Sequence, residues 1–154
     1  MKLMDFLDKR AIIPVLEKRN KEEVVREMVD KLVALGEIKD SEETVRILLE
    51  REKLGSTGIG EGVAIPHGKS KDVKKIAAVF AKAKEGVDFE ALDGEPVYLF
   101  FLLVAPESST SEHIKALARI SRLLKDSNFR KKLKMKQSAE EILSAISEED
   151  KRQP

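Results

Sequence analysis

Eight consecutive apolar residues, Val97 to Val104, constrain the fold of this 154-residue chain more than any other stretch. Pro96 and Pro106 bound the run, which is far shorter than the roughly 18 apolar residues that suggest a membrane-spanning helix. A strand that is apolar on both faces is typical of the centre of a sheet covered on both sides. The run therefore predicts a buried central strand with helices packed on each face of its sheet.

Segments with strand and helix character alternate along the rest of the chain. A further strand is expected at Ile76–Ala81, and an edge strand or extended segment at Ala11–Leu16, which contains Pro14. Amphipathic helices are expected where a capping residue precedes apolar residues at helical spacing, that is from Asn20 to Gly36, from Asp40 to Leu54, after Ser109 and after Ser138. The sequence thus predicts an α/β fold with a small mixed central sheet of about five strands sandwiched between helices. We expect residues 1–154 to form a single domain, with a frayed charged tail at 148–154.

Composition narrows the classes of function. The net charge is only +1, so nucleic acid is not an expected partner. No apolar run is long enough to cross a membrane and the N-terminus lacks a signal-peptide core, so we expect a cytoplasmic protein that does not insert into membranes. The chain has no cysteine, which excludes disulfides, thiolate nucleophiles, iron–sulfur clusters and thiolate zinc sites.

The stretch Glu52–Lys69 contains the first candidate for chemistry. Four glycines precede a short apolar run that leads into Pro66-His67-Gly68. Proline fixes its own φ and favours an extended conformation in the residue before it, so we expect a strand that ends there with His67 at its tip. Gly68 is expected to turn the chain at φ values that other residues avoid, which leaves the imidazole unobstructed. The alternative is a surface loop histidine without a function.

A second histidine and an arginine are candidates for the same site. His113 lies on the apolar stripe of the helix after Ser109, where it is either a hydrogen-bonded core residue or a first-turn donor to a bound anion. Arg51 falls at the C-terminal end of the helix that precedes the glycines. Imidazole is a good nucleophile near neutral pH, and a phosphoryl group on it needs cations or donors around its oxygens. The hypothesis that His67 carries phosphate, stabilised by Arg51 and His113, requires the two histidines to meet in space.

Other kinds of site fit the sequence less well. The two histidines are 46 positions apart and no local pair such as H-E-x-x-H occurs, so a metal site is not expected. The nucleophile-elbow pattern G-x-S-x-G is also absent. Gly68-Lys69-Ser70 resembles the end of a nucleotide-binding P-loop, but Val63 stands where that pattern requires its first glycine. A P-loop nucleotide-binding protein is therefore a weak alternative.

The residues that lead to His67 match the pattern of a known family. The pattern begins at Glu52, continues with Ile59-Gly60 and ends with Val63-Ala64-Ile65-Pro66-His67-Gly68. In these residues the chain resembles the type-2 enzyme IIA domains of the bacterial phosphoenolpyruvate-dependent sugar phosphotransferase system, the fructose, mannitol and nitrogen-regulatory group. The resemblance extends over almost the whole chain, from the region of Leu3 to Ile146.

This resemblance implies a phosphocarrier, a phosphotransferase that needs no metal or organic cofactor. It implies that His67 accepts a phosphoryl group on Nε2 from the carrier protein HPr and donates it to a cysteine of an enzyme IIB domain. Arg51 and His113 match the arginine and the second histidine that line the site in related domains. Fructose-type sugar uptake is the expected role, and a nitrogen-regulatory protein that binds partners according to its phosphorylation state is the alternative.

HPr and enzyme IIB would both dock on the face that carries His67, so we expect exposed apolar residues around this histidine. Ile59 and Val63 are candidates for such a rim, although we favour a place in the strand core for Val63 and Ile65. Lys69 is either a charge that steers an acidic partner or a solvated loop residue.

Overall fold

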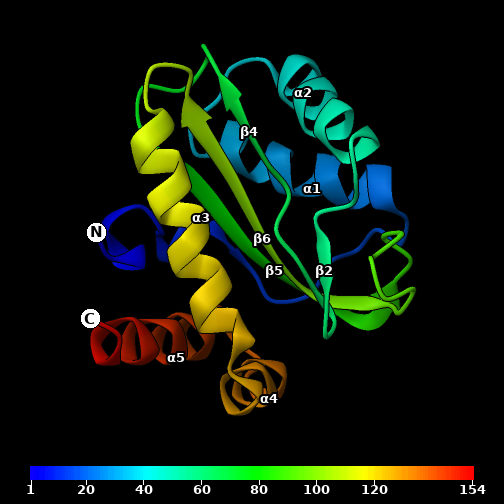
Figure 1. Ribbon diagram of the computed structural model, residues 1–154, viewed down its shortest axis with the longest axis vertical. Coiled ribbons are helices and arrows are strands. Elements are labelled where there is room, and N and C mark those ends of the chain that lie inside the picture. Colours follow the sequence, from blue (N-terminus) through cyan, green and yellow to red (C-terminus); the bar gives the residue numbers. More distant parts are fainter.

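The computed structural model describes residues 1–154, which form a mixed sheet with helices on both faces (Figure 1). The strands are β1 (Ile12–Ile13), β2 (Gly58–Gly60), β3 (Val63–Ala64), β4 (His67–Ser70), β5 (Ala77–Val87) and β6 (Val97–Pro106). The helices are α1 (Lys21–Ala34), α2 (Ser41–Lys53), α3 (Thr110–Lys125), α4 (Ser127–Met135) and α5 (Ala139–Arg152), with two short 3-10 helices, η1 (Leu3–Asp5) and η2 (Lys9–Ala11), before β1. The predicted α/β fold with a small mixed sheet between helices is confirmed.

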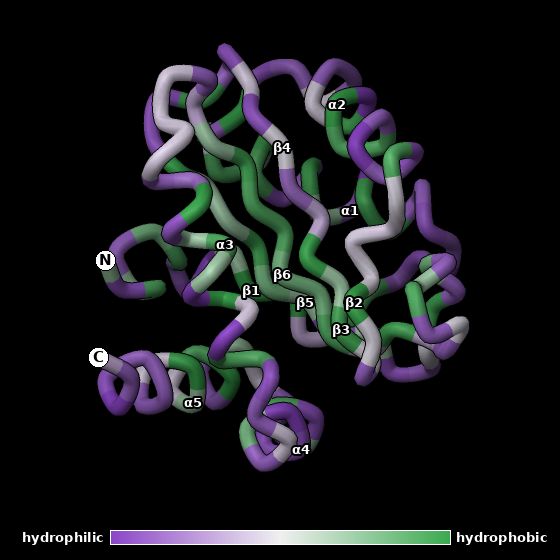
Figure 2. The backbone as a smooth tube through the Cα atoms, in the orientation of Figure 1, coloured by the Kyte–Doolittle hydropathy of each residue, from purple (hydrophilic) through white to green (hydrophobic).

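Strand β6 is the centre of the sheet. The strand order is β1-β5-β6-β3-β2, and β4 also pairs with β6. The long strand β5 runs antiparallel to β6, while β3 and β4 run parallel to it. All β6 residues except Tyr98 are buried, and Figure 2 shows β5 and β6 as the apolar middle of the molecule. The prediction of a central strand buried on both faces is therefore confirmed.

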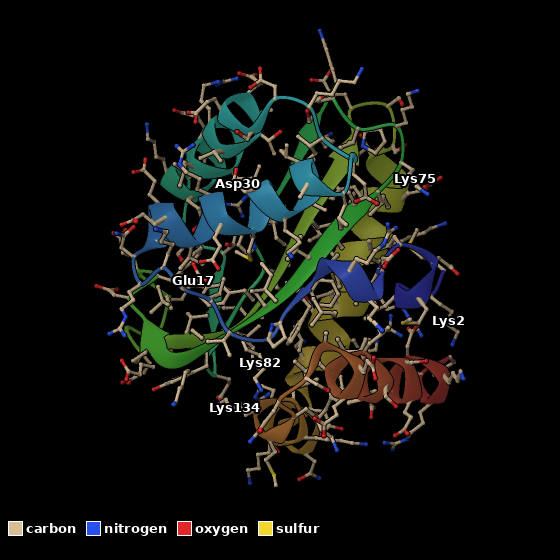
Figure 3. The ribbon with its side chains drawn as sticks, turned by 180° about the vertical axis from the view of Figure 1, so that it is seen from behind. Lys2, Glu17, Asp30, Lys75, Lys82 and Lys134 are labelled. Atoms are coloured by element: carbon tan, nitrogen blue, oxygen red, sulfur yellow. The ribbon has the colours of Figure 1, made fainter.

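The helices form two layers on opposite faces of the sheet. Helices α1 and α2 cover the face seen in Figure 3, and α3 crosses the face seen in Figure 1. Helix α1 packs against β5, α2 against β4, and α3 and α4 against β6. None of these helices is both long and apolar enough to span a lipid bilayer.

The helix starts follow the capping residues that the sequence predicts. The Asn20 side chain accepts the backbone N–H of Glu23 at α1, and Ser138 forms a reciprocal capping box at the start of α5. Ser109 occupies the N-cap position of α3, but its side chain makes no capping hydrogen bond.

Helix α4 was not predicted from the sequence. Asp126 caps it by accepting the backbone N–H groups of Asn128 and Phe129. At its other end Lys82 of β5 donates a hydrogen bond to the carbonyl of Lys134 at 3.1 Å and another to the carbonyl of Lys136. Figure 3 shows Lys82 and Lys134 close together at this end of the molecule. The C-terminal cap therefore comes from a distant strand and has no local sequence signal.

The expectation of a frayed tail at 148–154 is wrong. Helix α5 continues to Arg152, and Asp150 near its end is almost fully buried. The Arg119 guanidinium of α3 donates to Asp150 Oδ1 at 2.7 Å and also to the carbonyl oxygens of Asp150, Gln153 and Pro154. The charged end of α5 is ordered because α3 supplies a buried opposite charge and donors for the free carbonyls.

Candidate active site

His67 lies in the sheet at the first residue of β4. Strand β3 ends at Ala64, as expected from Pro66, but the chain then resumes a parallel pairing in which His67 stands opposite Leu103 of β6. The carbonyl of Pro66 accepts the backbone N–H of Leu103 at 2.9 Å. The expected position of His67 at a free strand tip is therefore wrong. Instead, hydrogen bonds to the central strand fix the backbone on which the imidazole is carried.

Gly68 is a glycine for a different reason from the one predicted. Its φ is not positive, so it makes no left-handed turn. A Cβ atom at this position would lie 2.9 Å from Cγ2 of Ile47 in α2, closer than carbon atoms can approach without displacement. Glycine therefore lets α2 pack directly on β4 beside His67. This close packing places the end of α2, with Arg51, near the imidazole.

The two histidines meet, as the phosphate hypothesis requires. The ring centroids of His67 and His113 are 5.5 Å apart, and the rings are inclined by 62°. His113 lies in the first turn of α3 and only 7% of its surface is exposed. Its Nε2 is buried and has no hydrogen-bond partner in the protein. A buried imidazole nitrogen without a partner is unusual in a folded protein and suits a group that bonds to a ligand.

The orientation of the His67 ring is set by its own backbone. The Nδ1 atom lies 2.8 Å from the carbonyl oxygen of Ile65, which can only accept a hydrogen bond. Nδ1 therefore carries the proton, and in the neutral ring the lone pair is on Nε2. Burial lowers the pKa of His67, the bond to Ile65 opposes that shift, the charge of Arg51 lowers the pKa further and the charge of Glu52 raises it. With a pKa below its usual value of 6.5, His67 is mostly neutral at pH 7.

His113 is neutral over an even wider range. Burial lowers its pKa to about 4, with smaller contributions from His67, once that ring is protonated, and from the charge of Lys69. A neutral imidazole carries one N–H group, so near pH 7 His113 can donate one hydrogen bond without bringing a charge into the site. It can therefore bind an oxygen of a phosphoryl group carried by His67.

Arg51 supplies a positive charge close enough to His67 to lower its pKa. It lies in the last turn of α2, and its Nη1 donates to the carbonyl of Gly55 at 2.8 Å. It makes no hydrogen bond to either histidine, so the three candidates do not form one bonded cluster. A guanidinium has five N–H donors, and the bond to Gly55 uses one of them. The others remain for oxygens brought to His67.

Two further charged residues belong to this region. Lys69 lies two positions after His67 on β4, hence on the same face of the strand, and its Nζ donates to Thr110 Oγ1 at the start of α3 at 3.1 Å. Glu52, at the first position of the family pattern, is buried and accepts hydrogen bonds from Thr57. The sequence predicted a turn at Gly68 that would place Lys69 in a loop, and no local signal predicts the burial of Glu52.

The proposed apolar rim is only partly present. The side chain of Ile59 is exposed near the glycine-rich stretch, together with that of Leu54. Val63 and Ile65 are buried, as favoured from the sequence. Ile114, the neighbour of His113 in α3, is another exposed apolar side chain.

Comparison with known proteins places the fold in the class of phosphotransferase-system IIA domains. The crystal structure of the nitrogen regulatory protein IIA-Ntr from Neisseria meningitidis has a TM-score of 0.84 and 34% identity, over 92% of this chain and 97% of that one. The IIA domain in the complex of enzyme IIA and phosphorylated enzyme IIB of mannitol from Escherichia coli has a TM-score of 0.78 and 28% identity, over 92% and 97% of the two chains. Residues 5–149 match the family "Phosphoenolpyruvate-dependent sugar phosphotransferase system, EIIA 2". The chain belongs to this family of phosphotransfer relay proteins.

Relatives in sequence include both regulatory and sugar-specific proteins. A nitrogen regulatory protein of Bradyrhizobium diazoefficiens is 42% identical over 147 residues, which are 96% of this chain and 95% of that protein. The fructose-specific EIIABC component of Bacillus subtilis is 40% identical over 151 residues, which are 98% of this chain but only 24% of that protein. The family is thus established, and both kinds of role occur among its members.

Proposed function

We propose that this protein is a phosphohistidine relay in which His67 accepts a phosphoryl group from HPr and passes it to a cysteine of an enzyme IIB domain. The observation that carries this proposal is the hydrogen bond between His67 Nδ1 and the Ile65 carbonyl. It leaves Nε2 as the free nucleophile beside His113. The family of phosphotransfer relay proteins and the IIA–IIB complex of the mannitol relative support the choice of partners.

In the first step the Nε2 lone pair of His67 forms a new N–P bond while the bond between phosphorus and the donor imidazole breaks. The electron pair of the broken bond stays with the donor. The His67 ring gains a positive charge because Nδ1 keeps its proton, and the hydrogen bond to the Ile65 carbonyl stabilises that charge. In the second step a thiolate of the acceptor forms the S–P bond, the N–P bond breaks, and His67 becomes neutral again.

Arg51 and His113 stabilise the group during transfer in this proposal. The equatorial oxygens of a transferring phosphoryl group carry negative charge, and catalysis of such transfers consists mainly of positioning and electrostatic stabilisation. Arg51 has guanidinium N–H groups that are not used in its bond to Gly55. His113 has a buried Nε2 without a partner, and it lies at the N-terminal end of α3, which favours anions.

The experiment that tests the proposal is a phosphorylation assay. The protein is incubated with phosphoenolpyruvate, enzyme I and HPr, and acid-labile phosphate is followed on the wild type and on His67→Ala. We expect label on the wild type and none on the variant. Absence of label on the wild type with active partners would overturn the proposal.

A regulatory role is the second candidate, because the nitrogen regulatory relative matches along nearly its whole length. The fructose-specific relative supports the first candidate, a cytoplasmic protein that serves fructose-type sugar uptake, since it matches 98% of this chain. Transfer of label from phosphorylated His67 to a fructose-type enzyme IIB domain separates the two roles. Efficient transfer supports uptake, whereas a stable phosphoprotein with partners that bind only one phosphorylation state supports regulation.

A further inference from the structure

A chain of hydrogen bonds connects the buried carboxylate of Glu52 to the ring of His67. Both Glu52 oxygens lie within hydrogen-bond distance of the backbone N–H of Thr57, at 3.1 Å and 3.3 Å, and Glu52 Oε2 also accepts the Thr57 hydroxyl. The carbonyl of Thr57 accepts the backbone N–H of Ile65 at 3.0 Å. The carbonyl of Ile65 is the acceptor for His67 Nδ1 at 2.8 Å. The carboxylate and the imidazole are therefore connected by direct hydrogen bonds joined through the backbone of Thr57 and of Ile65.

The carboxylate at the far end of the chain is itself held by a cation. Lys21 Nζ, in the first turn of α1, lies 2.9 Å from Glu52 Oε1, and only 17% and 3% of the two side chains are exposed. The same ammonium lies 4.8 Å from the centre of the Phe89 ring, an additional cation–π contact. Burying a carboxylate costs free energy unless it is paired and hydrogen-bonded, so Lys21 offsets that cost and fixes the position of Glu52.

We propose that Glu52, held by Lys21, is a positioning residue that fixes the tautomer and orientation of His67 through Thr57 and Ile65. The catalytic part of this inference rests on the proposed function of His67 as phosphoryl acceptor. Glu52 touches neither His67 nor the reacting atoms. It holds Thr57, and with it the strand segment whose carbonyl selects the Nδ1-protonated ring and leaves Nε2 free.

The charged groups around His67 act on it in different ways. Arg51 lowers its pKa and Glu52 raises it. His113 faces the ring, and the charge of Lys69 lowers the pKa of His113. Glu52 therefore contributes in two separable ways: its negative charge raises the pKa of His67, and its hydrogen bonds hold the backbone. Glu52→Gln removes the charge but keeps an oxygen that can accept from Thr57, whereas Glu52→Ala removes both.

Nitrogen-15 NMR of the His67 ring separates these contributions without any partner protein. We expect the wild type to show one neutral tautomer, protonated at Nδ1. Glu52→Gln should keep that tautomer with a lower pKa of His67, while Glu52→Ala should populate both tautomers. Glu50→Gln is the matched control, because it makes the same change of charge on the same helix at an exposed residue outside the chain of hydrogen bonds, and it should behave as the wild type.

The phosphorylation assay measures how the loss of Glu52 changes the rate of phosphoryl acceptance by His67. We expect Glu52→Ala to slow phosphoryl acceptance about tenfold at saturating HPr with little change in KM, because a misoriented nucleophile lowers the rate of the chemical step. If Glu52→Ala does not fold, Thr57→Val and Lys21→Met each remove one partner of the carboxylate and should move the tautomer ratio in the same direction. A single Nδ1 tautomer with an unchanged pKa in folded Glu52→Gln, Thr57→Val and Lys21→Met would overturn the inference. Failure of HPr to label the wild type would overturn only the proposed function, since the tautomer measurement does not depend on it.

Discussion

Replacing Gly68 by alanine tests the reason for a glycine directly after His67. The new methyl carbon would lie 2.9 Å from Ile47 Cγ2 and 3.5 Å from Leu48 Cδ2. Carbon atoms attract each other best at about 3.5–4.0 Å, so the first contact is a clash and the second is ordinary. Gly68 does not have a positive φ, so the variant adds steric overlap without left-handed backbone strain.

The structure limits how this overlap can be relieved. Ile47 is β-branched and lies in α2, where its χ1 angle is restricted, so its methyl group cannot rotate away easily. Either α2 or β4 must shift, and overpacking of this kind costs about 1–3 kcal/mol. We therefore expect Gly68→Ala to lower the free energy of unfolding by about 1–3 kcal/mol. Arg51 lies one turn beyond Ile47 on the same helix, so phosphoryl acceptance by His67 should also become slower.

A double-mutant cycle assigns the cost to the named contact. Ile47→Ala removes Cγ2, so the effect of Gly68→Ala should become much smaller in that background, with a coupling energy of roughly 1 kcal/mol or more. Urea unfolding of the four proteins, followed by circular dichroism, gives the free energies. Equal destabilisation by Gly68→Ala in both backgrounds, or none in the wild type, would refute the explanation of Gly68 by close packing against α2.

Three further predictions concern pH, the end of α5 and the start of α4. Burial lowers the pKa of His113 from 6.5 to about 4, so the unfolded chain binds more protons between these values. The free energy of unfolding should therefore fall as the pH drops through this interval, and His113→Gln should make the pH dependence measured by urea unfolding less steep. Asp150→Ala leaves the buried Arg119 without its partner and should cost about 3–5 kcal/mol in the same measurement. Glu148→Ala, which breaks an exposed pair, should cost less than about 1 kcal/mol, and equal losses would contradict a buried end of α5. Asp126→Ala removes the cap of α4 and should cost about 1 kcal/mol, with amide hydrogen exchange faster at Asn128 and Phe129.

Local patterns were sufficient for most of the secondary structure. Capping at Asn20 and Ser138 involves residues within one helical turn, and β6 consists of one continuous apolar run, so short stretches of sequence contain the whole signal. The ordered end of α5 was missed because Arg119, which stabilises it, is distant in sequence. Helix α4 has a local cap in Asp126, but its C-terminal end depends on the distant Lys82. The sequence of a charged segment such as the end of α5 does not reveal whether a distant residue will form a buried ion pair with it.

The sequence by itself determined the class of fold, the strand and helix order around the centre, and His67 as the first candidate, because these depend on periodicity and on the backbone limits of proline and glycine. Only the tertiary structure decided that His67 and His113 lie 5.5 Å apart. It also decided that Gly68 serves packing and not a turn, and that Glu52 is buried against Lys21. The physical reason is that burial, pKa and contact distance depend on which distant segments the sheet brings together. His67 and His113, 46 positions apart in the sequence, acquire a common environment only when the fold brings β4 and the start of α3 together.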